Sequence, residues 1–267
     1  MSAISLRLFI PGICALALLA CACRRPANDD TEVVFSLDPE FTIDLFEERN
    51  PSNGAAVFGM WVESMASFDC NNYTIKGSAT LHTDLLEIRL EDISAPDTCI
   101  GDPGRARGFI PIGPLADGLY RFRVLRNLPI VNEGTLLVEN GHYELSLAKE
   151  QDIVFQNRVL ESLPQGYVWG YALAPMEQDL PQADQFLATL KPLTAEPLLP
   201  PGFYSYFTVS GTGQYFFHSS IAPKGQHRPF LRRFSGDPDA LRALLKSYRE
   251  DPVRPLEIRC KSTQGDY

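Results

Sequence analysis

The sequence has little of what enzymes and nucleic-acid-binding proteins usually need. Its 33 acidic residues outnumber the 24 basic ones, and no block is rich in lysine and arginine, so nucleic acid is not an expected partner. There is no Gly-x-Ser-x-Gly elbow and no phosphate-binding glycine loop. The only histidines, which are scattered without the spacing of a helical metal site, are His82, His142, His218 and His227. We therefore expect no enzyme, no metal and no other cofactor.

Long apolar runs are also missing from most of the chain. After the N-terminal region no segment approaches the about 18 consecutive apolar residues of a membrane-spanning helix. Hydrophobic residues nevertheless make up 45% of the sequence and charged residues 21%, a composition that builds hydrophobic cores and excludes a disordered chain. The length is that of one large domain or two of ordinary size.

The first 20 residues have the composition of a secretory signal peptide. Arg7 precedes an apolar run over residues 8–20, which is too short to span a bilayer as a stable helix. The run ends in Leu18-Leu19-Ala20-Cys21, which resembles the lipobox of bacterial lipoproteins.

This resemblance implies that residues 1–20 are removed and that Cys21 becomes the lipidated first residue. Its acyl chains, such as palmitate, would hold the protein on a membrane, because three apolar tails exceed the two signals that stable attachment needs. Ala22 follows the cysteine, and the sorting rule of some bacteria then favours the outer membrane, on its periplasmic or surface face. Two alternatives remain open, an ordinary signal peptide without a lipid and lipidation of Cys23. Residues 21–31 are polar and charged and are expected to be a flexible tether.

The remaining cysteines predict one disulfide bond. Cys70 and Cys99 lie in the same half of an exported chain, where disulfides persist, so we expect them to be bonded. A bridge that closes roughly 30 residues stabilises the fold by about 3 kcal/mol in the loop-entropy account. Cys260 alternates with apolar residues in a strand pattern and is expected to be a small buried side chain.

Residues 32–150 form a succession of short strand patterns separated by turn residues, which predicts an all-β sandwich. The sharpest turn signal is Asn140-Gly141, which favours a type I′ hairpin between the flanking strands. The expected strands cover residues 33–37, 42–46, 56–62, 73–75, 85–90, 108–112, 120–125, 135–139 and 142–147.

One stretch carries a resemblance to known folds. Residues 115–124 resemble the Leu-x-x-Gly-x-Tyr edge of immunoglobulin-like and transthyretin-like modules in bacterial surface and periplasmic proteins, with Gly118 in the turn and Tyr120 at the strand start. The resemblance implies that the tyrosine ring lies against the core. It implies no function, because such sandwiches have many roles.

Residues 163–267, after an expected linker at 151–162, alternate strands with helices. The predicted strands cover residues 167–173, 203–209, 214–220 and 256–260. The predicted helices begin at Asp179 and at Asp237, because a proline in the first turn and apolar residues at helical spacing follow each aspartate. The order strand, helix, strand, strand, helix, strand is the βαββαβ pattern of ferredoxin-like α+β domains. In this fold both helices cover one face of the sheet and leave the other face open.

The open face carries the candidate binding residues. Aromatic side chains that alternation places together on the first two strands of this half are Trp169, Tyr171, Tyr204 and Tyr206. Exposed aromatic rings can stack on a carbohydrate or contact a protein. The alternatives are that this face packs on the first domain, or that the rings point toward the helices.

The segment 221–230 is expected to be an exposed loop with a local excess of positive charge. The basic residues in and after it are Lys224, His227, Arg228, Arg232 and Arg233. They could contact an anionic glycan or an acidic partner, or could simply be solvated. A hydrolase would require His218 or His227 to lie in a cleft beside a carboxylate or Ser219.

These observations predict a non-enzymatic lipoprotein of the cell envelope, anchored to the membrane through its N-terminal lipid. Its expected role is that of an accessory or scaffold subunit with an envelope protein as partner. The alternative is a glycan-binding surface lipoprotein that uses the aromatic residues of the second half.

Overall fold

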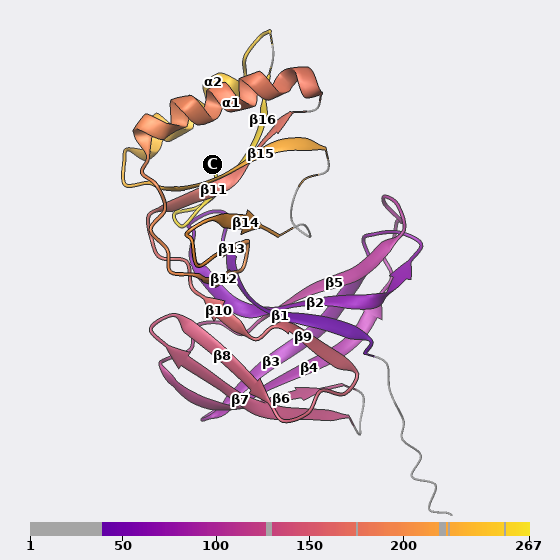
Figure 1. The fold of residues 1–267 in the computed structure, drawn as a ribbon. Helices are drawn as coiled ribbons and strands as arrows, with labels where there is room; N and C mark the ends of the chain where they lie inside the picture. Colours follow the sequence, from indigo (N-terminus) through magenta and orange to yellow (C-terminus); the bar gives the residue numbers. More distant parts are fainter. Residues whose placement is uncertain (1–38, 127–129, 175, 219–222, 224, 254) are drawn as a thin grey trace, which may run out of the picture. The chain divides into compact units, whose positions relative to one another are not determined.

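The computed structural model describes residues 39–126, 130–174, 176–218, 223, 225–253 and 255–267 (Figure 1). Cys21, Cys23 and the strand expected at 33–37 lie outside the described residues. None of the helices in the described ranges has the length and apolar character needed to cross a membrane.

The first half of the described chain is a single ten-stranded sheet (Figure 1). In space its strands follow the order β10-β8-β7-β6-β4-β3-β5-β2-β1-β9. The strands are β1 (Phe41–Arg49), β2 (Ala56–Phe68), β3 (Thr74–His82), β4 (Leu85–Ser94), β5 (Gly104–Pro111), β6 (Gly118–Leu125), β7 (Val131–Glu139), β8 (His142–Leu147), β9 (Ile153–Asn157) and β10 (Val159–Glu161).

Alternation along the strands buries one face of this sheet. On β1 the side chains of Phe41, Ile43 and Leu45 are buried in the same cluster as Leu86 and Ile88 of β4. Burying each such side chain contributes about 1.5–3 kcal/mol before the entropy of ordering is subtracted. The inward rows of all these strands therefore form one core.

The predicted two-sheet sandwich is wrong, because the sheet curves until its two edges approach each other. β9 pairs in parallel with β1, β10 pairs with β8, and β10 also contacts β1. The two edge strands, β9 and β10, both lie within the expected linker 151–162. Alternation shows which side chains face inward, but it cannot show whether they face a second sheet or the far side of the same sheet.

Two local predictions in this half are confirmed. β7 and β8 form an antiparallel hairpin around Asn140 (φ 51°) and Gly141 (φ 81°), and positive φ at both residues is the requirement of a type I′ turn. β6 begins at Gly118, and the half-buried ring of Tyr120 packs against the core. The Tyr120 ring thus lies as the resemblance at residues 115–124 implies, but Gly118 is the first residue of the strand rather than part of the turn, and the implied sandwich fold is wrong.

The second half contains two three-stranded sheets and two α-helices. One sheet has the order β15-β11-β16 and the other β12-β13-β14, and each strand is antiparallel to its neighbour. The strands are β11 (Tyr167–Ala174), β12 (Gly202–Tyr204), β13 (Phe207–Val209), β14 (Tyr215–Phe217), β15 (Gln226–Arg233) and β16 (Glu257–Ser262). The helices are η1 (Glu177–Asp179), α1 (Leu180–Leu190), η2 (Lys191–Leu193) and α2 (Pro238–Arg249).

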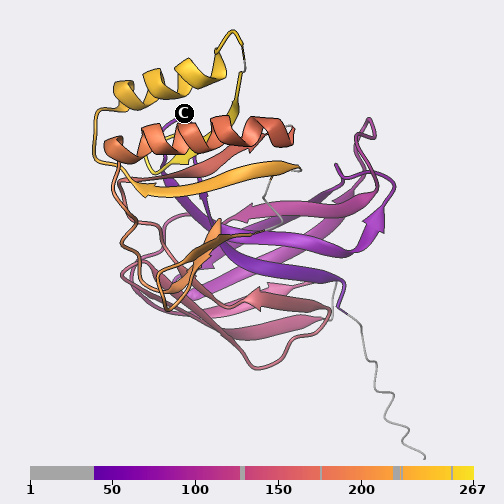
Figure 2. The ribbon, with the colours of Figure 1, turned by 45° about the horizontal axis from the view of Figure 1, so that its top comes forward.

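Both α-helices lie side by side on one face of the β15-β11-β16 sheet (Figures 1 and 2). α2 begins as predicted, since the Asp237 side chain accepts a hydrogen bond from the Asp239 backbone N–H. The Asp179 carboxylate does not cap α1, because it accepts a bond from the Met176 backbone N–H instead.

The predicted ferredoxin-like βαββαβ domain is also wrong. The hairpin expected to supply its second and third strands forms the separate β12-β13-β14 sheet, and the expected loop at 221–230 contains most of β15. Pro229 explains why β15 is hard to predict, because proline cannot donate to a ladder and is found in sheets on edge strands. The strand expected at 203–209 also turns at Ser205 and Tyr206, which separate β12 from β13.

An aromatic cluster joins the two halves. Phe46 of β1 packs with Trp169 of β11 and with Tyr206, whose ring centroid lies 5.3 Å from that of Phe46. The described residues therefore share a core across the expected boundary near residue 163.

Candidate functional site

The predicted disulfide bond is present. Cys70 in the β2–β3 loop is bonded to Cys99 in the β4–β5 loop. Asn72 of the first loop accepts a hydrogen bond from the Ile100 N–H and donates one to the Thr98 carbonyl, both in the second loop. The bridge therefore joins two loops of the large sheet. Cys260 is a buried free thiol, and burial raises its pKa to about 12, so it has little thiolate character.

The four aromatic candidates do not form an exposed surface. Trp169, Tyr171, Tyr204 and Tyr206 are all buried, with at most 8% of each exposed. Burial raises the pKa of Tyr171 and of Tyr204 to about 12 each. Trp169 and Tyr206 lie in the cluster between the two halves, with ring centroids 5.1 Å apart. These buried rings therefore cannot stack on a glycan at the surface. The expected alternative, packing against the first half, describes Trp169, Tyr204 and Tyr206, whereas Tyr171 packs on Phe217 and His227 of the second half.

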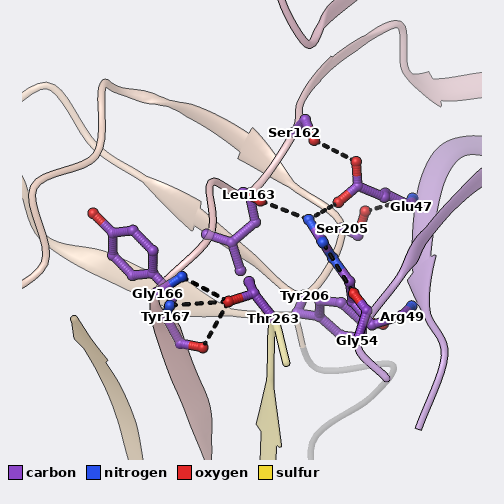
Figure 3. A network of polar contacts seen from close by, with 10 residues as sticks. All are labelled: Glu47, Arg49, Gly54, Ser162, Leu163, Gly166, Tyr167, Ser205, Tyr206 and Thr263. Atoms are coloured by element: carbon purple, nitrogen blue, oxygen red, sulfur yellow. Dashed lines mark hydrogen bonds and ion pairs between the residues drawn. The ribbon is translucent and has the colours of Figure 1, made fainter. Parts of the chain in front are cut away.

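A buried polar network lies where β1 meets the second half (Figure 3). Glu47 and Arg49 continue the inward face of β1, and their side chains are only 5% and 3% exposed. The Arg49 guanidinium forms an ion pair with Glu47 and donates to the carbonyls of Leu163 (2.6 Å) and Gly54 (3.2 Å). The Ser162 hydroxyl donates to the other Glu47 oxygen.

The backbone of the same two residues is bound by the β12–β13 turn. The Glu47 N–H donates to the Ser205 hydroxyl (2.7 Å), and the Arg49 N–H donates to the Tyr206 hydroxyl (3.2 Å). Each buried charge thus has a charged partner and further hydrogen bonds, the condition under which a buried pair is tolerated. We call Glu47, Arg49, Ser162, Ser205 and Tyr206 the junction network, and its complete pairing indicates a structural role.

His218, a candidate for hydrolase chemistry, is held on both ring nitrogens. Nε2 lies 3.0 Å from the Thr208 hydroxyl, and Nδ1 lies 3.2 Å from the Ser205 carbonyl. Because a carbonyl only accepts hydrogen bonds, Nδ1 is the donor in the second contact. Its ring stacks on Phe203 with centroids 4.6 Å apart. Burial lowers its pKa, while the Ser205 carbonyl and the charge of Asp44 act in the opposite direction. This geometry fixes the β13–β14 hairpin, and Ser219 lies outside the described residues.

The basic residues expected in a loop are distributed along β15. Arg228 forms a two-pronged contact with Asp184 of α1, at 2.6 and 3.2 Å, and Arg232 pairs with Glu196 at 2.6 Å. Arg233 is exposed and bridges through its backbone to Ala195. Lys224 lies outside the described residues. Much of this charge thus connects β15 to its neighbours.

Two adjacent hollows lie on either side of Tyr215 of β14. The larger has a volume of about 330 Å³ and the smaller about 250 Å³. The larger hollow is apolar and is lined by Pro197, Leu198, Leu199, Pro200, Val209, Gly213, Tyr215 and Leu231. The smaller is lined by Leu187, Ala188, Leu190, Lys191, Glu196, Tyr215, Pro229, Phe230 and Arg232.

We call these two hollows together the Tyr215 groove. Leu198, which lines the larger hollow, is 68% exposed. Large apolar side chains gathered around a concave surface are typical of a binding site. This groove was not predicted from the sequence. The signal that was present is the run Pro197-Leu198-Leu199-Pro200, because its prolines disfavour helix and strand and leave two leucines in an irregular segment.

Among the described residues, no three histidine, cysteine or acidic side chains are grouped so that they could bind a metal ion. Comparison with known proteins gives no further guidance, because no family model, no curated protein and no solved structure matches the chain.

Proposed function

We propose that this protein is a non-enzymatic lipoprotein of the cell envelope that acts as an accessory or scaffold subunit. The lipobox resemblance at Leu18-Leu19-Ala20-Cys21 supports the lipid anchor. The Cys70–Cys99 bond is in keeping with an exported protein, because such bonds persist in oxidising compartments and are rare in the cytosol.

The Tyr215 groove is the observation that best supports the scaffold role. It combines two hollows of about 330 and 250 Å³, the larger of them lined by apolar residues, with the exposed side chain of Leu198. Surface apolar groups in a concave site lose contact with water when a partner covers them, and this loss favours association. A protein partner of the same envelope would bind here while the lipid holds the complex on the membrane.

Photocrosslinking in the native cells tests the partner site. A benzophenone amino acid replaces Leu198 in the groove or, as a matched control, Leu119 on β6, which is 64% exposed and outside the groove. We expect a discrete crosslinked protein band from position 198 and none from position 119. The same bands from both positions, or none from either, would contradict a partner site in the groove.

The anchor is tested separately by mass spectrometry of the intact protein and by cell fractionation. We expect the mature chain to begin at Cys21 and to carry three acyl groups, and Cys21→Ser to release the protein into the soluble envelope fraction. A wild-type chain without acyl mass, or with the lipid on Cys23, would refute the proposed site.

A further inference from the structure

We propose that the Tyr215 groove binds an extended, acidic and apolar segment of a partner protein, which adds as a strand to the free edge of β14. This inference rests on the proposed scaffold function and specifies the chemistry of its partner. Three independent features support it: the two hollows, the orientation of the β14 backbone and the charge around the groove.

The hollows require apolar side chains from the occupant. Tyr215 contributes to both, so the two lie next to each other on either side of its side chain. In an extended segment every second side chain points to the same face. Two such side chains can therefore enter the two hollows while the residues between them point away.

The β14 edge has backbone groups available for pairing. The Ser210 N–H donates to the Gln214 carbonyl, and the His218 N–H donates to the Tyr206 carbonyl, so the even-numbered residues of the hairpin face β13. The backbone groups of Tyr215 and Phe217 then face away from β13. β14 is an edge strand of its sheet among the described residues. An added strand would bind these groups, as in other cases of β-strand addition.

The facing strand cannot close this gap itself. On β15 the Arg233 N–H points outward to Ala195, so by the two-residue period of a strand the outward positions include Leu231 and Pro229. Proline has no N–H, and the β15 edge therefore lacks a donor in its middle. Tyr215 shares a hollow with Pro229, but β14 and β15 belong to different sheets. Among the described residues, no strand pairs with the β14 edge at the groove.

The charged residues that line the smaller hollow favour an acidic occupant. The smaller hollow is lined by two cations, Lys191 and Arg232, and one anion, Glu196. The Arg232 guanidinium lowers the pKa of Glu196 by its hydrogen bond and charge, so this carboxylate is ionised and already paired. This local excess of cations contrasts with the net charge of −9 of the whole chain. Carboxylates on the partner would meet favourable potential here.

Binding of three synthetic peptides to the full chain carrying Cys21→Ser tests the proposal without detergent. The first peptide alternates leucine with glutamate, the second alternates leucine with lysine, and the third is the glutamate peptide with N-methyl groups on every second residue. We expect the first to bind, the second to bind at least about tenfold more weakly, and the third to lose about tenfold or more because its edge donors are blocked.

A pair of charge reversals identifies the site. Lys191→Glu should weaken the glutamate peptide by about fivefold. The control Lys246→Glu, on an exposed position of α2, should change nothing. Equal binding of the glutamate and lysine peptides, insensitivity to N-methylation, or equal effects of the two reversals would each overturn the proposal.

Two further outcomes separate this inference from the scaffold function. Binding of phosphatidylglycerol vesicles at the groove in place of the glutamate peptide would identify a lipid ligand and overturn the inference. A crosslink from position 198 together with no peptide binding would overturn the acidic-strand chemistry and leave the scaffold function standing. Peptide binding without any cellular crosslink would support the groove chemistry and count against the scaffold function.

Discussion

Replacing Arg49 by methionine removes the guanidinium from the junction network while keeping a side chain of similar length. The Glu47 carboxylate then remains buried, 5% exposed, without its countercharge. The carbonyls of Leu163 and Gly54 lose the donor that binds them at 2.6 and 3.2 Å. The variant thus leaves one charge and two polar groups buried and incompletely paired.

The expected loss is large. Breaking a buried ion pair by removing one partner costs about 3–5 kcal/mol, because the remaining charge stays desolvated. The two carbonyls add to this cost unless water reaches them. We expect the free energy of unfolding to fall by about 4 kcal/mol, a large part of the stability of an ordinary domain.

Urea unfolding followed by tryptophan fluorescence measures this loss, with circular dichroism as a second probe of two-state behaviour. The chain offers a matched control in Arg89, which pairs with Glu87 two residues away on β4 but is 55% exposed. Arg89→Met should cost less than about 1 kcal/mol, as exposed pairs do.

A double-mutant cycle isolates the pair itself. Glu47→Gln removes the charge but keeps an acceptor, so combining it with Arg49→Met should cost about 1–3 kcal/mol less than the sum of the two single changes. Additive effects, or a cost of Arg49→Met no larger than that of Arg89→Met, would refute the conclusion that the junction network depends on compensated buried charge.

Three further predictions follow from the structure. Replacing Cys70 and Cys99 together by alanine should lower the free energy of unfolding by about 3–4 kcal/mol, because the bond closes a separation of 29 residues; urea titration with and without reductant checks this, and equal midpoints would contradict it. Gly170→Ala should cost about 3 kcal/mol, since its Cβ would collide with a backbone oxygen of β16, whereas Gly211→Ala, with no described atom within 4 Å, should leave the thermal midpoint nearly unchanged. Burial lowers the pKa of His218 below 6.5. The free energy of unfolding should therefore decrease as the pH falls from 6.5 through the folded-state pKa, because protonation favours the unfolded chain. NMR titration of the imidazole measures the folded-state pKa, and a pKa above 6.5 would contradict this prediction.

Local chemistry made parts of the structure predictable. The turn at Asn140 and the start of α2 at Asp237 depend on residues within a few positions, and both are confirmed. Burial of Cys260 and the Cys70–Cys99 bond also followed from the pattern of residues and the expected compartment.

What could not be predicted depends on residues far apart in the chain. The parallel pairing of β9 with β1 is set by the curvature of the sheet, which no stretch of sequence displays. β15 was hidden because Pro229 and its basic neighbours resemble a loop, and only its edge position makes the proline acceptable. The Tyr215 groove combines a proline-rich segment with residues of α1, β13, β14 and β15, so its residues appear unrelated until the chain is folded.

The contacts at the β1–β2 turn have a consequence for how the chain folds during synthesis. The Pro51 carbonyl accepts a hydrogen bond from the Asp266 N–H at 2.7 Å, and Gly54 lies against the backbone of Thr263. At about 5–20 residues per second, the ribosome makes residues 263–266 roughly 10–40 s after residues 51–54. The β1–β2 turn therefore gains these contacts long after it has been made. Long-range pairing of this kind slows folding, and the exposed strands must be shielded from other chains until residues 263–266 have been made.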